Sequence, residues 1–527
     1  ACASACVMSR LARRLATFAR DAHASCARVD LPHALALRAS SSAAGPSPRR
    51  FAVVGSGPAG MYAVLALTKT FDGAKVDVFE RYPAPFGLVR YGVAPDHAET
   101  KLVTNKFHET LTTRDDVAFY GNVQLGRDVS LGELYDSYHG VVLACGTSGD
   151  RRLEVPGEGE HRGVLGAREF VAWFNGDPEH GPQSATHAAV VEALRSRDGD
   201  AHVAVIGVGN VAIDCARVLL RDADALAGTD ICEHALEVLR AHPVRAVSVI
   251  GRRGVAQASF SPKELRELLN LRNVRVVISD ENLALEPEDE AELAENRPRR
   301  RAHEAFVKRK TAGECASEDG CTKILNVRFL ASPLAFGGEN GVLSWMKLGR
   351  NELVGAAGAR KSIASGETEM VPTALALRSV GYRAEPIQMT VKDESLTQLR
   401  LPFDEKNRVV PNAYGAVAVS ADSADTIPRL YVTGWLKRGP TGIIGTNLTC
   451  ADETIAKMAA DFAVAPPPDP VEDGVDRLLE KRGVRVVRAA DWIQIDRLER
   501  ERGAARGKPR EKFVSTADAL KAIDRSL

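Results

Sequence analysis

Two glycine-rich turns of the same kind lie about 150 residues apart in this chain. Each follows a run of apolar, largely β-branched residues, at positions 51–54 and 203–206, and each precedes an alanine-rich stretch with helical character. The turn residues are Gly55, Gly57, Ala59 and Gly60 in the first copy, and Gly207, Val208, Gly209, Asn210 and Val211 in the second. A buried strand, a tight glycine turn and a helix N-terminus together bind the pyrophosphate of a dinucleotide. We therefore expect an α/β protein with two Rossmann-like units.

The two units differ in the residue that ends the strand after each helix. In the first unit that residue is Glu80, about 20 residues past the last glycine, where a carboxylate can bind the ribose hydroxyls of FAD. In the second unit Gly251 is followed by Arg252 and Arg253, which suit the 2′-phosphate of NADP better than a bare ribose. A single turn of this kind can also join a strand and a helix without any ligand, but two copies with fitting strand ends argue against that alternative. The residues predict a flavoprotein reductase with one FAD site and one NADP(H) site.

The composition fits a large enzyme and excludes some other classes of protein. With 527 residues, of which 45% are hydrophobic, the chain can form two or three domains with sizeable cores. The formal net charge is zero, so no overall field favours nucleic acid or a membrane surface. No apolar run approaches the ~18 residues that a membrane-spanning helix needs. The nine cysteines are scattered, and we expect Cys145 and Cys215 to be reduced thiols within core elements.

The first 50 residues differ in composition from the rest of the chain. They contain eight arginines against two aspartates, and alanine and serine fill much of the remainder. An Arg-rich, Ser-rich and acid-poor segment is typical of an organelle transit peptide. We therefore expect residues 1–50 to be a transit peptide or disordered leader. An ordinary disordered extension, or a plastid rather than a mitochondrial destination, stays open on composition alone.

Two further segments are rich in glycine and proline and carry a family resemblance. One is the loop at 81–97 that follows Glu80, and the other runs from Gly434 and Trp435 to Gly442 and on to 446. Together with the two glycine turns and the Gly-Arg-Arg-Gly segment at 251–254, they resemble the adrenodoxin reductase family, the mitochondrial-type ferredoxin–NADP reductases. The resemblance covers about residues 51–465 and resumes in the tail at 490–496 and 507–513.

The resemblance implies a fold in which an NADP domain is inserted into a discontinuous FAD domain. On this chain the FAD domain would be 51–147 and 381–527, the latter including the C-terminal tail, and the NADP domain would be 148–380. Stretches at 181–200, 221–245 and 280–365 depart from the family's usual length. Because they are charged or glycine-rich, we expect them to be surface insertions.

The resemblance also implies an activity. Hydride would pass from NADPH to FAD, and single electrons would leave for an acidic [2Fe–2S] ferredoxin in the mitochondrial matrix, serving iron–sulfur, haem or sterol chemistry. Any membrane association would be peripheral, at the inner membrane. No CxxC pair occurs in the sequence, so electrons are expected to leave from the flavin edge and not through a disulfide.

Carried over residue by residue, the resemblance assigns the cofactor contacts. FAD would contact Ala59, Glu80, Leu88, Val123, Trp435, Gly442, Ile443 and Ile444, and NADP would contact Val208, Gly209, Asn210, Val211, Arg252, Arg253, Glu264 and Gly442. The family's proton-handling pair would be His97 and Asp214, and histidine suits that task near neutral pH. The alternative is structural, because Asp214 could cap or anchor the helix after the second glycine turn. No metal site is expected.

The densest basic segment suggests where the ferredoxin binds. Its position matches the family's docking arginines, and complementary charge steers association. The docking residues would be Arg297, Arg299, Arg300 and Arg301. The alternative is a solvated helix face balanced by the acidic run at 286–292.

Two other functions remain to be distinguished. One is an NADPH-dependent flavin reductase or monooxygenase with a small organic acceptor, which would turn over without ferredoxin. The other is a flavin-bearing binding protein that has lost catalysis. The intact second turn with Arg252 and Arg253 argues against a binder, because such a protein has no use for NADP.

Overall fold

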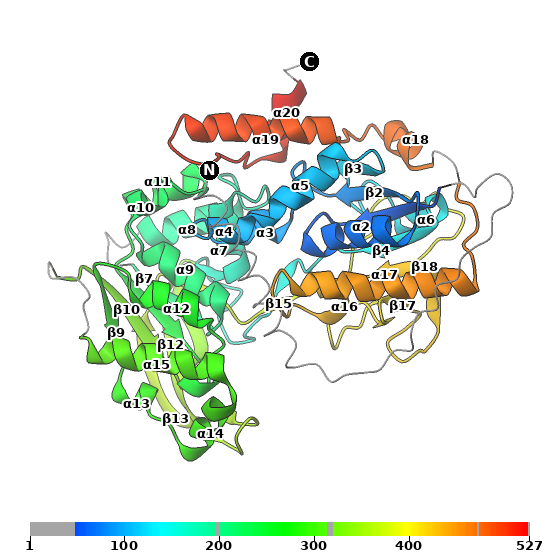
Figure 1. Ribbon diagram of the computed structural model, residues 1–527. Coiled ribbons are helices and arrows are strands. Elements are labelled where there is room, and N and C mark those ends of the chain that lie inside the picture. Colours follow the sequence, from blue (N-terminus) through cyan, green and yellow to red (C-terminus); the bar gives the residue numbers. More distant parts are fainter. Residues whose placement is uncertain (1–47, 196–200, 314–319, 472–473, 525–527) are drawn as a thin grey trace, which may run out of the picture. The chain divides into compact units, whose positions relative to one another are not determined.

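The computed structural model describes residues 48–195, 201–313, 320–471 and 474–524 (Figure 1). The predicted leader at 1–50 lies outside the described residues, apart from its last three positions. Within the described part, a seven-stranded sheet of mainly parallel strands and a six-stranded parallel sheet hold the two glycine-rich turns at the carboxyl ends of their strands.

The first sheet has seven strands in the order β16-β17-β18-β4-β1-β2-β3, and the five strands from β18 to β3 run parallel. Alternate residues of β1 point to opposite faces of the sheet and so pack into two different hydrophobic cores, as the pleat requires. Phe51 and Val53 pack with α2, α5, α17 and α19, whereas Ala52 and Val54 pack with α6 and α18. The strands are β1 (Arg50–Val54), β2 (Lys75–Glu80), β3 (Val117–Gly121), β4 (Gly140–Leu143), β16 (Asn412–Ala413), β17 (Ala416–Ala418) and β18 (Thr426–Val432).

The second sheet has six parallel strands in the order β6-β14-β7-β8-β10-β9, and all of them come from the chain between β4 and β18. One Rossmann-like unit is thus inserted into another, which confirms the predicted fold class. The chain passes from one unit to the other near residue 147 and returns near residue 381, and at these two places β5 pairs with β15 in a two-stranded ribbon. The exact domain borders stay predictions. The strands are β5 (Gly149–Asp150), β6 (Val164–Gly166), β7 (His202–Ile206), β8 (Ala246–Ile250), β9 (Val274–Val277), β10 (Lys323–Arg328), β14 (Leu375–Arg378) and β15 (Tyr382–Arg383).

Helices cover both faces of the first sheet and one face of the second. In Figure 1, α2 and α17 lie side by side, and α19 runs beside α5. The helices of the first part are α2 (Pro58–Thr70), α3 (Leu88–Tyr91), α4 (Ala98–Lys101), α5 (Val103–Thr113), α6 (Leu131–Ser137), α16 (Trp435–Arg438), α17 (Thr446–Val464), α18 (Gly474–Lys481), α19 (Ala489–Ala504) and α20 (Thr516–Asp524). Those of the second are α7 (Ala167–Asn175), α8 (Ala185–Arg195), α9 (Asn210–Leu220), α10 (Ala223–Leu226), α11 (Glu233–Ala241), α12 (Pro262–Leu269), α13 (Asp280–Leu283), α14 (Pro287–Glu295), α15 (Arg297–Thr311) and the 3₁₀ turn η2 (Val255–Gln257).

A three-stranded antiparallel sheet covers the other face of the second sheet. Its strands are β11 (Ala331–Glu339), β12 (Val342–Val354) and β13 (Lys361–Pro372). Phe336 and Met346 pack there against Ala204 and Ile206 of β7. The expectation of a surface insertion at 280–365 is therefore wrong, because this stretch supplies both the internal strand β10 and a layer of the core. Helices α8 and α11, from the other two stretches, also bury apolar faces in the core.

Among the described residues, no helix combines the length and the apolar character that crossing a bilayer requires.

Candidate functional site

The first glycine turn closes tightly where β1 meets α2. Gly55 has a φ of +107°, and a Cβ there would lie 2.4 Å from the carbonyl oxygen of Ala144, the residue after β4. A Cβ at Gly60 would lie 1.8 Å from the Gly55 oxygen, so only glycine lets helix and strand approach this closely. At Gly57, by contrast, a Cβ would meet nothing nearer than Gly87 at 4.0 Å. The open position at the helix N-terminus is what a pyrophosphate needs.

Glu80 ends β2 beside this turn and is 7% exposed. Its carboxylate accepts hydrogen bonds from the Ser56 hydroxyl at 2.6 Å, the Ser56 N–H at 3.1 Å and the Tyr82 N–H at 3.2 Å. A carboxylate has about four acceptor positions, so Glu80 can hold the turn and still accept from a ribose hydroxyl. The hydroxyl oxygen of Thr147, after β4, is buried without a hydrogen-bond partner among the described residues. These features fit an adenosine half of FAD.

The remaining residues assigned to FAD lie on segments that reach the same edge of the sheet. Val123 is 1% exposed, and its N–H donates to the Glu80 carbonyl at 2.9 Å. Leu88 begins α3 and is half-buried. Ala59 lies against Gly434, where a Cβ would come within 2.4 Å of the Ala59 Cβ.

Trp435 and the loop before α17 lie at the end of β18. The Trp435 ring stacks on Tyr382 of β15, with 5.3 Å between ring centroids. Its indole N–H donates to the Thr441 carbonyl at 3.1 Å. Gly442 and Ile443 are exposed and Ile444 is half-buried, so this loop can contact a bound ligand. Trp435 is therefore not a core tryptophan.

The second glycine turn repeats the geometry of the first where β7 meets α9. Gly207 has a φ of +140°, and a Cβ there would lie 2.1 Å from the Ser379 carbonyl oxygen. Gly209 precedes α9, and a Cβ there would meet only the Ser259 hydroxyl oxygen, at 3.6 Å. The Ser259 N–H donates to the Val208 carbonyl at 2.9 Å, and the Ser261 N–H donates to the Asn210 side chain at 2.7 Å. The segment at 259–261 thus frames the helix N-terminus and leaves Gly209 open, with Val211 half-buried in its first turn.

Arg252 and Arg253 follow β8 and are exposed. Among the described residues, neither guanidinium has a carboxylate within ion-pair distance. Glu264, in the first turn of α12, has one carboxylate oxygen that is buried without a hydrogen-bond partner in the described part of the chain. Two free guanidinium groups and an unsatisfied carboxylate beside a helix N-terminus fit a phosphorylated dinucleotide.

The structure brings His97 and Asp214 together. The His97 Nδ1 lies 4.0 Å from the nearer Asp214 carboxylate oxygen, and its Nε2 lies 2.8 Å from the Glu267 carboxylate of α12. Asp214 does not cap α9, because Gly209 is at the N-cap. Burial raises the pKa of Asp214 to about 6, although Arg217 opposes the shift.

Arg217 connects this pair to the residue before His97. Its guanidinium, 1% exposed, donates to Asp96 at 2.7 and 2.9 Å and to Asp214 at 2.7 Å. Arg221 adds a further bond to Asp96 at 2.9 Å. A buried bidentate pair therefore fixes the loop that carries His97 against α9.

The basic segment forms α15. Arg297, Arg300 and Arg301 are exposed, and Arg299 is half-buried with its guanidinium 3.5 Å from Glu292 of α14. Arg300 lies 3.8 Å from Glu304 on the same helix. Among the described residues, Arg297 and Arg301 have no carboxylate within ion-pair distance.

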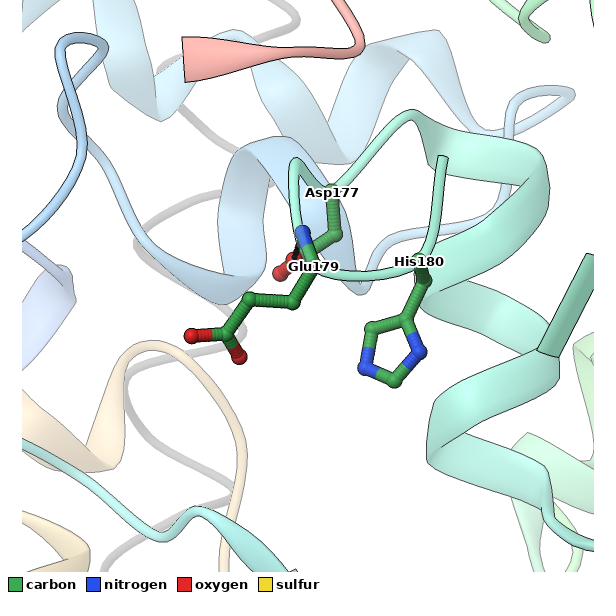
Figure 2. Close-up of side chains that lie close together, drawn as sticks. All are labelled: Asp177, Glu179 and His180. Atoms are coloured by element: carbon green, nitrogen blue, oxygen red, sulfur yellow. Dashed lines mark hydrogen bonds between the residues drawn. The ribbon is translucent and has the colours of Figure 1, made fainter. Parts of the chain in front are cut away.

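One cluster of possible metal ligands lies after α7, where Figure 2 shows Asp177, Glu179 and His180 on a single turn. Each has a protein partner. Asp177 accepts from the Tyr82 hydroxyl at 2.8 Å, Glu179 pairs with Arg81 at 3.4 Å, and His180 bonds to Thr186 at 2.9 Å. The cluster ties this turn to the loop that follows Glu80.

Comparison with known proteins gives the family. The family model described as "Pyridine nucleotide-disulphide oxidoreductase" matches residues 49–281. The mitochondrial NADPH:adrenodoxin oxidoreductase of Arabidopsis thaliana is 40% identical over 490 residues, covering 91% of this chain and 96% of that protein. The protein of the same name from Bos taurus is 38% identical, with 89% and 91% coverage. The chain belongs to the adrenodoxin reductase family.

A solved structure of a relative agrees with the membership in the adrenodoxin reductase family. FprA of Mycobacterium tuberculosis, solved in complex with NADPH, matches with a TM-score of 0.79 at 35% identity, covering 90% of this chain and all of that one. The resemblance found in the sequence is thereby confirmed. The individual site residues stay predictions.

Four residues of the site were missed by the sequence analysis. Glu267 lies three residues after Glu264 on one helix face, a spacing that could have suggested it. Ser56 lies inside the first glycine turn. Tyr382 gave no signal, because its partner Trp435 is far away in sequence, and the bond of Arg217 to Asp96 is equally distant. Of the two expected core cysteines, both are free thiols, but Cys145 is exposed after β4 and only Cys215 is buried.

Proposed function

We propose that this protein takes a hydride from NADPH and passes single electrons to a [2Fe–2S] ferredoxin, with FAD as the resident cofactor. When bound, FAD supplies the exchange between two-electron and one-electron chemistry. The observation that carries the proposal lies at the second turn, where the exposed Arg252 and Arg253 pair with no carboxylate among the described residues. Glu264, on the helix whose N-cap Ser261 bonds to Asn210, has a buried carboxylate oxygen without a partner in the same part of the chain. We assign FAD to residues 51–147 and 381–527 and NADP to residues 148–380.

The chain's own residues position the two cofactors and handle protons. The helix N-termini after Gly57 and Gly209 receive the pyrophosphates, and Glu80 receives the adenosine ribose of FAD. We assign proton handling to His97 and Asp214, because burial raises the pKa of the Asp214 carboxyl to about 6 and the His97 Nδ1 lies 4.0 Å from it. Glu267 holds the imidazole in place through its Nε2.

The ferredoxin binds at α15 in this proposal. An acidic partner is favoured because the nearby acidic run does not neutralise the exposed arginines. Glu286 and Asp289 pair with Arg360, and Glu292 lies 3.5 Å from Arg299 of α15. Arg297 and Arg301 therefore keep their charge available for steering and docking.

The relatives from Arabidopsis thaliana and Bos taurus are named as mitochondrial proteins, and we assign this protein to mitochondria. The arginine-rich composition of residues 1–50 supports import. We propose the matrix as the compartment and, at most, peripheral contact with the inner membrane.

The decisive experiment compares electron acceptors. Purified protein with NADPH is assayed for cytochrome c reduction with and without a mitochondrial-type [2Fe–2S] ferredoxin. We expect reduction to depend on ferredoxin, and NADH to replace NADPH poorly. Fast NADPH oxidation with a small organic acceptor such as a quinone, and no stimulation by ferredoxin, would favour the flavin reductase or monooxygenase instead.

A further inference from the structure

The turn that carries Arg252 and Arg253 is held at every backbone carbonyl. The carbonyls of Gly251, Arg253 and Gly254 accept hydrogen bonds from the backbone N–H groups of Ala331, Leu330 and Gln257, at 3.0, 3.1 and 3.2 Å respectively. The Arg252 carbonyl instead accepts from a side chain, the Asn351 amide, at 2.9 Å. Asn351 is therefore the side chain that completes this set of bonds.

Asn351 is itself fixed. It lies on β12, is 6% exposed, and its amide nitrogen also donates to the Ser332 hydroxyl at 2.7 Å. Its backbone N–H donates to the carbonyl of Leu330 at 2.7 Å, and Leu330 is the residue whose N–H binds the Arg253 carbonyl. Asn351 and Leu330 together thus support the turn at Arg252 and Arg253.

The far side of the turn is closed by a buried polar network. Gln257, 3% exposed, donates to Asp289 at 2.8 Å and to Glu292 at 3.2 Å. The Gln257 N–H donates to the Gly254 carbonyl at 3.2 Å, which joins this network to the turn. Arg360 pairs with Asp289 at 2.8 Å from the loop after β12.

We propose that Asn351 is a positioning residue that determines NADPH selectivity by fixing the Arg252–Arg253 turn. Two adjacent guanidinium groups repel each other, and nothing in the described part of the chain pairs with them. Holding the backbone in the phosphate-binding conformation before the ligand arrives lowers the ordering cost of binding. Asn351 acts in this proposal through the turn, since its amide bonds to the Arg252 carbonyl. This inference rests on the proposed NADP site.

The test is a double-mutant cycle on the Michaelis constants for NADPH and NADH, with ferricyanide as electron acceptor. Asn351→Asp keeps the shape but replaces the donor by a carboxylate that repels the Arg252 carbonyl. We expect the KM for NADPH to rise about five- to tenfold, with kcat and the KM for NADH changed less than about twofold, as loss of one buried hydrogen bond implies. In the Arg252→Ala/Arg253→Ala background, the same substitution should leave the KM for NADPH unchanged.

Asn340→Asp is the matched control, since it makes the same chemical change at the exposed turn between β11 and β12, about 30 Å away along β12. It should not alter either Michaelis constant. If Asn351→Asp does not fold, Asn351→Ala enters the same cycle.

Two results would overturn the inference about Asn351. One is an equal rise in KM for both nucleotides, and the other is an equal rise in KM for NADPH in both backgrounds. If Arg252→Ala/Arg253→Ala itself leaves NADPH preference intact, the proposed NADP site fails, whatever Asn351 does.

Discussion

At the scale of a single residue, Asp214 is a carboxylate that is largely buried in the site and not solvated at the surface. Its side chain is 15% exposed and lies between Arg217 and His97. The sequence suggested a proton-handling role only through resemblance to a family. The pattern of residues could not reveal the burial or the Arg217 bond to Asp96, since that aspartate lies 121 positions away.

The raised pKa of Asp214 predicts a pH-dependent stability difference. Because the native carboxyl has a pKa of about 6, above its ordinary value, the native state binds a proton that the unfolded state releases between about pH 4 and 6. The protonated Asp214 therefore contributes to the free energy of unfolding at low pH, and wild type loses this contribution as the pH rises through 6. Asp214→Asn has no such group and does not lose it. The asparagine can still accept from Arg217. The variant should gain on the order of 2 kcal/mol relative to wild type between pH 4.5 and pH 7.5.

Urea denaturation of both proteins at pH 4.5 and pH 7.5 measures this change. Groups that titrate alike in both proteins cancel from the comparison. If wild type and variant differ in their free energy of unfolding by the same amount at both pH values, the pKa of Asp214 is not raised in the native protein.

At the scale of elements, α14 and α15 show what composition can and cannot tell. The charge run predicted a basic helix, and α15 is one. Composition also suggested that neighbouring acids would balance it. The acids are instead engaged by Arg360 and Gln257, which are distant in sequence, so their pairing could not be read from the chain.

The docking proposal predicts a selective loss of ferredoxin activity. Charge reversal at Arg297 and Arg301 should reduce ferredoxin-dependent cytochrome c reduction about tenfold or more at low salt, because rim charges set association rates. Ferricyanide reduction by NADPH should survive, since it needs no protein partner. The ferredoxin-dependent rate of wild type should fall toward that of the variant as ionic strength rises past ~0.15 M, where the Debye length is ~8 Å.

Reversal of Glu304 to lysine, on the same helix, is the control and should not weaken ferredoxin binding. Unchanged ferredoxin kinetics in the double reversal would move the docking site elsewhere.

At the scale of the whole molecule, the residues themselves predicted two Rossmann-like units. The insertion of one unit into the other was implied by the family resemblance, and the structure confirms it. The three-stranded sheet was not foreseen, because its alternating apolar residues are diluted by glycine and charge. The tail was recognised by resemblance alone. In the structure, two ion pairs attach the tail to the rest of the protein. Glu499 forms a buried pair with Arg90, and Lys512 bonds to Asp230 at 3.0 Å.

The central claim is that one chain joins a two-electron donor to a one-electron protein acceptor. Anaerobic titration tests it most directly, with the yellow absorbance of the bound flavin as the signal and its identity checked as FAD after release. One equivalent of NADPH should bleach the absorbance, and two equivalents of oxidised ferredoxin should restore it, because each accepts one electron. A flavin that NADPH bleaches but ferredoxin cannot restore, while a small organic acceptor does, would contradict the account.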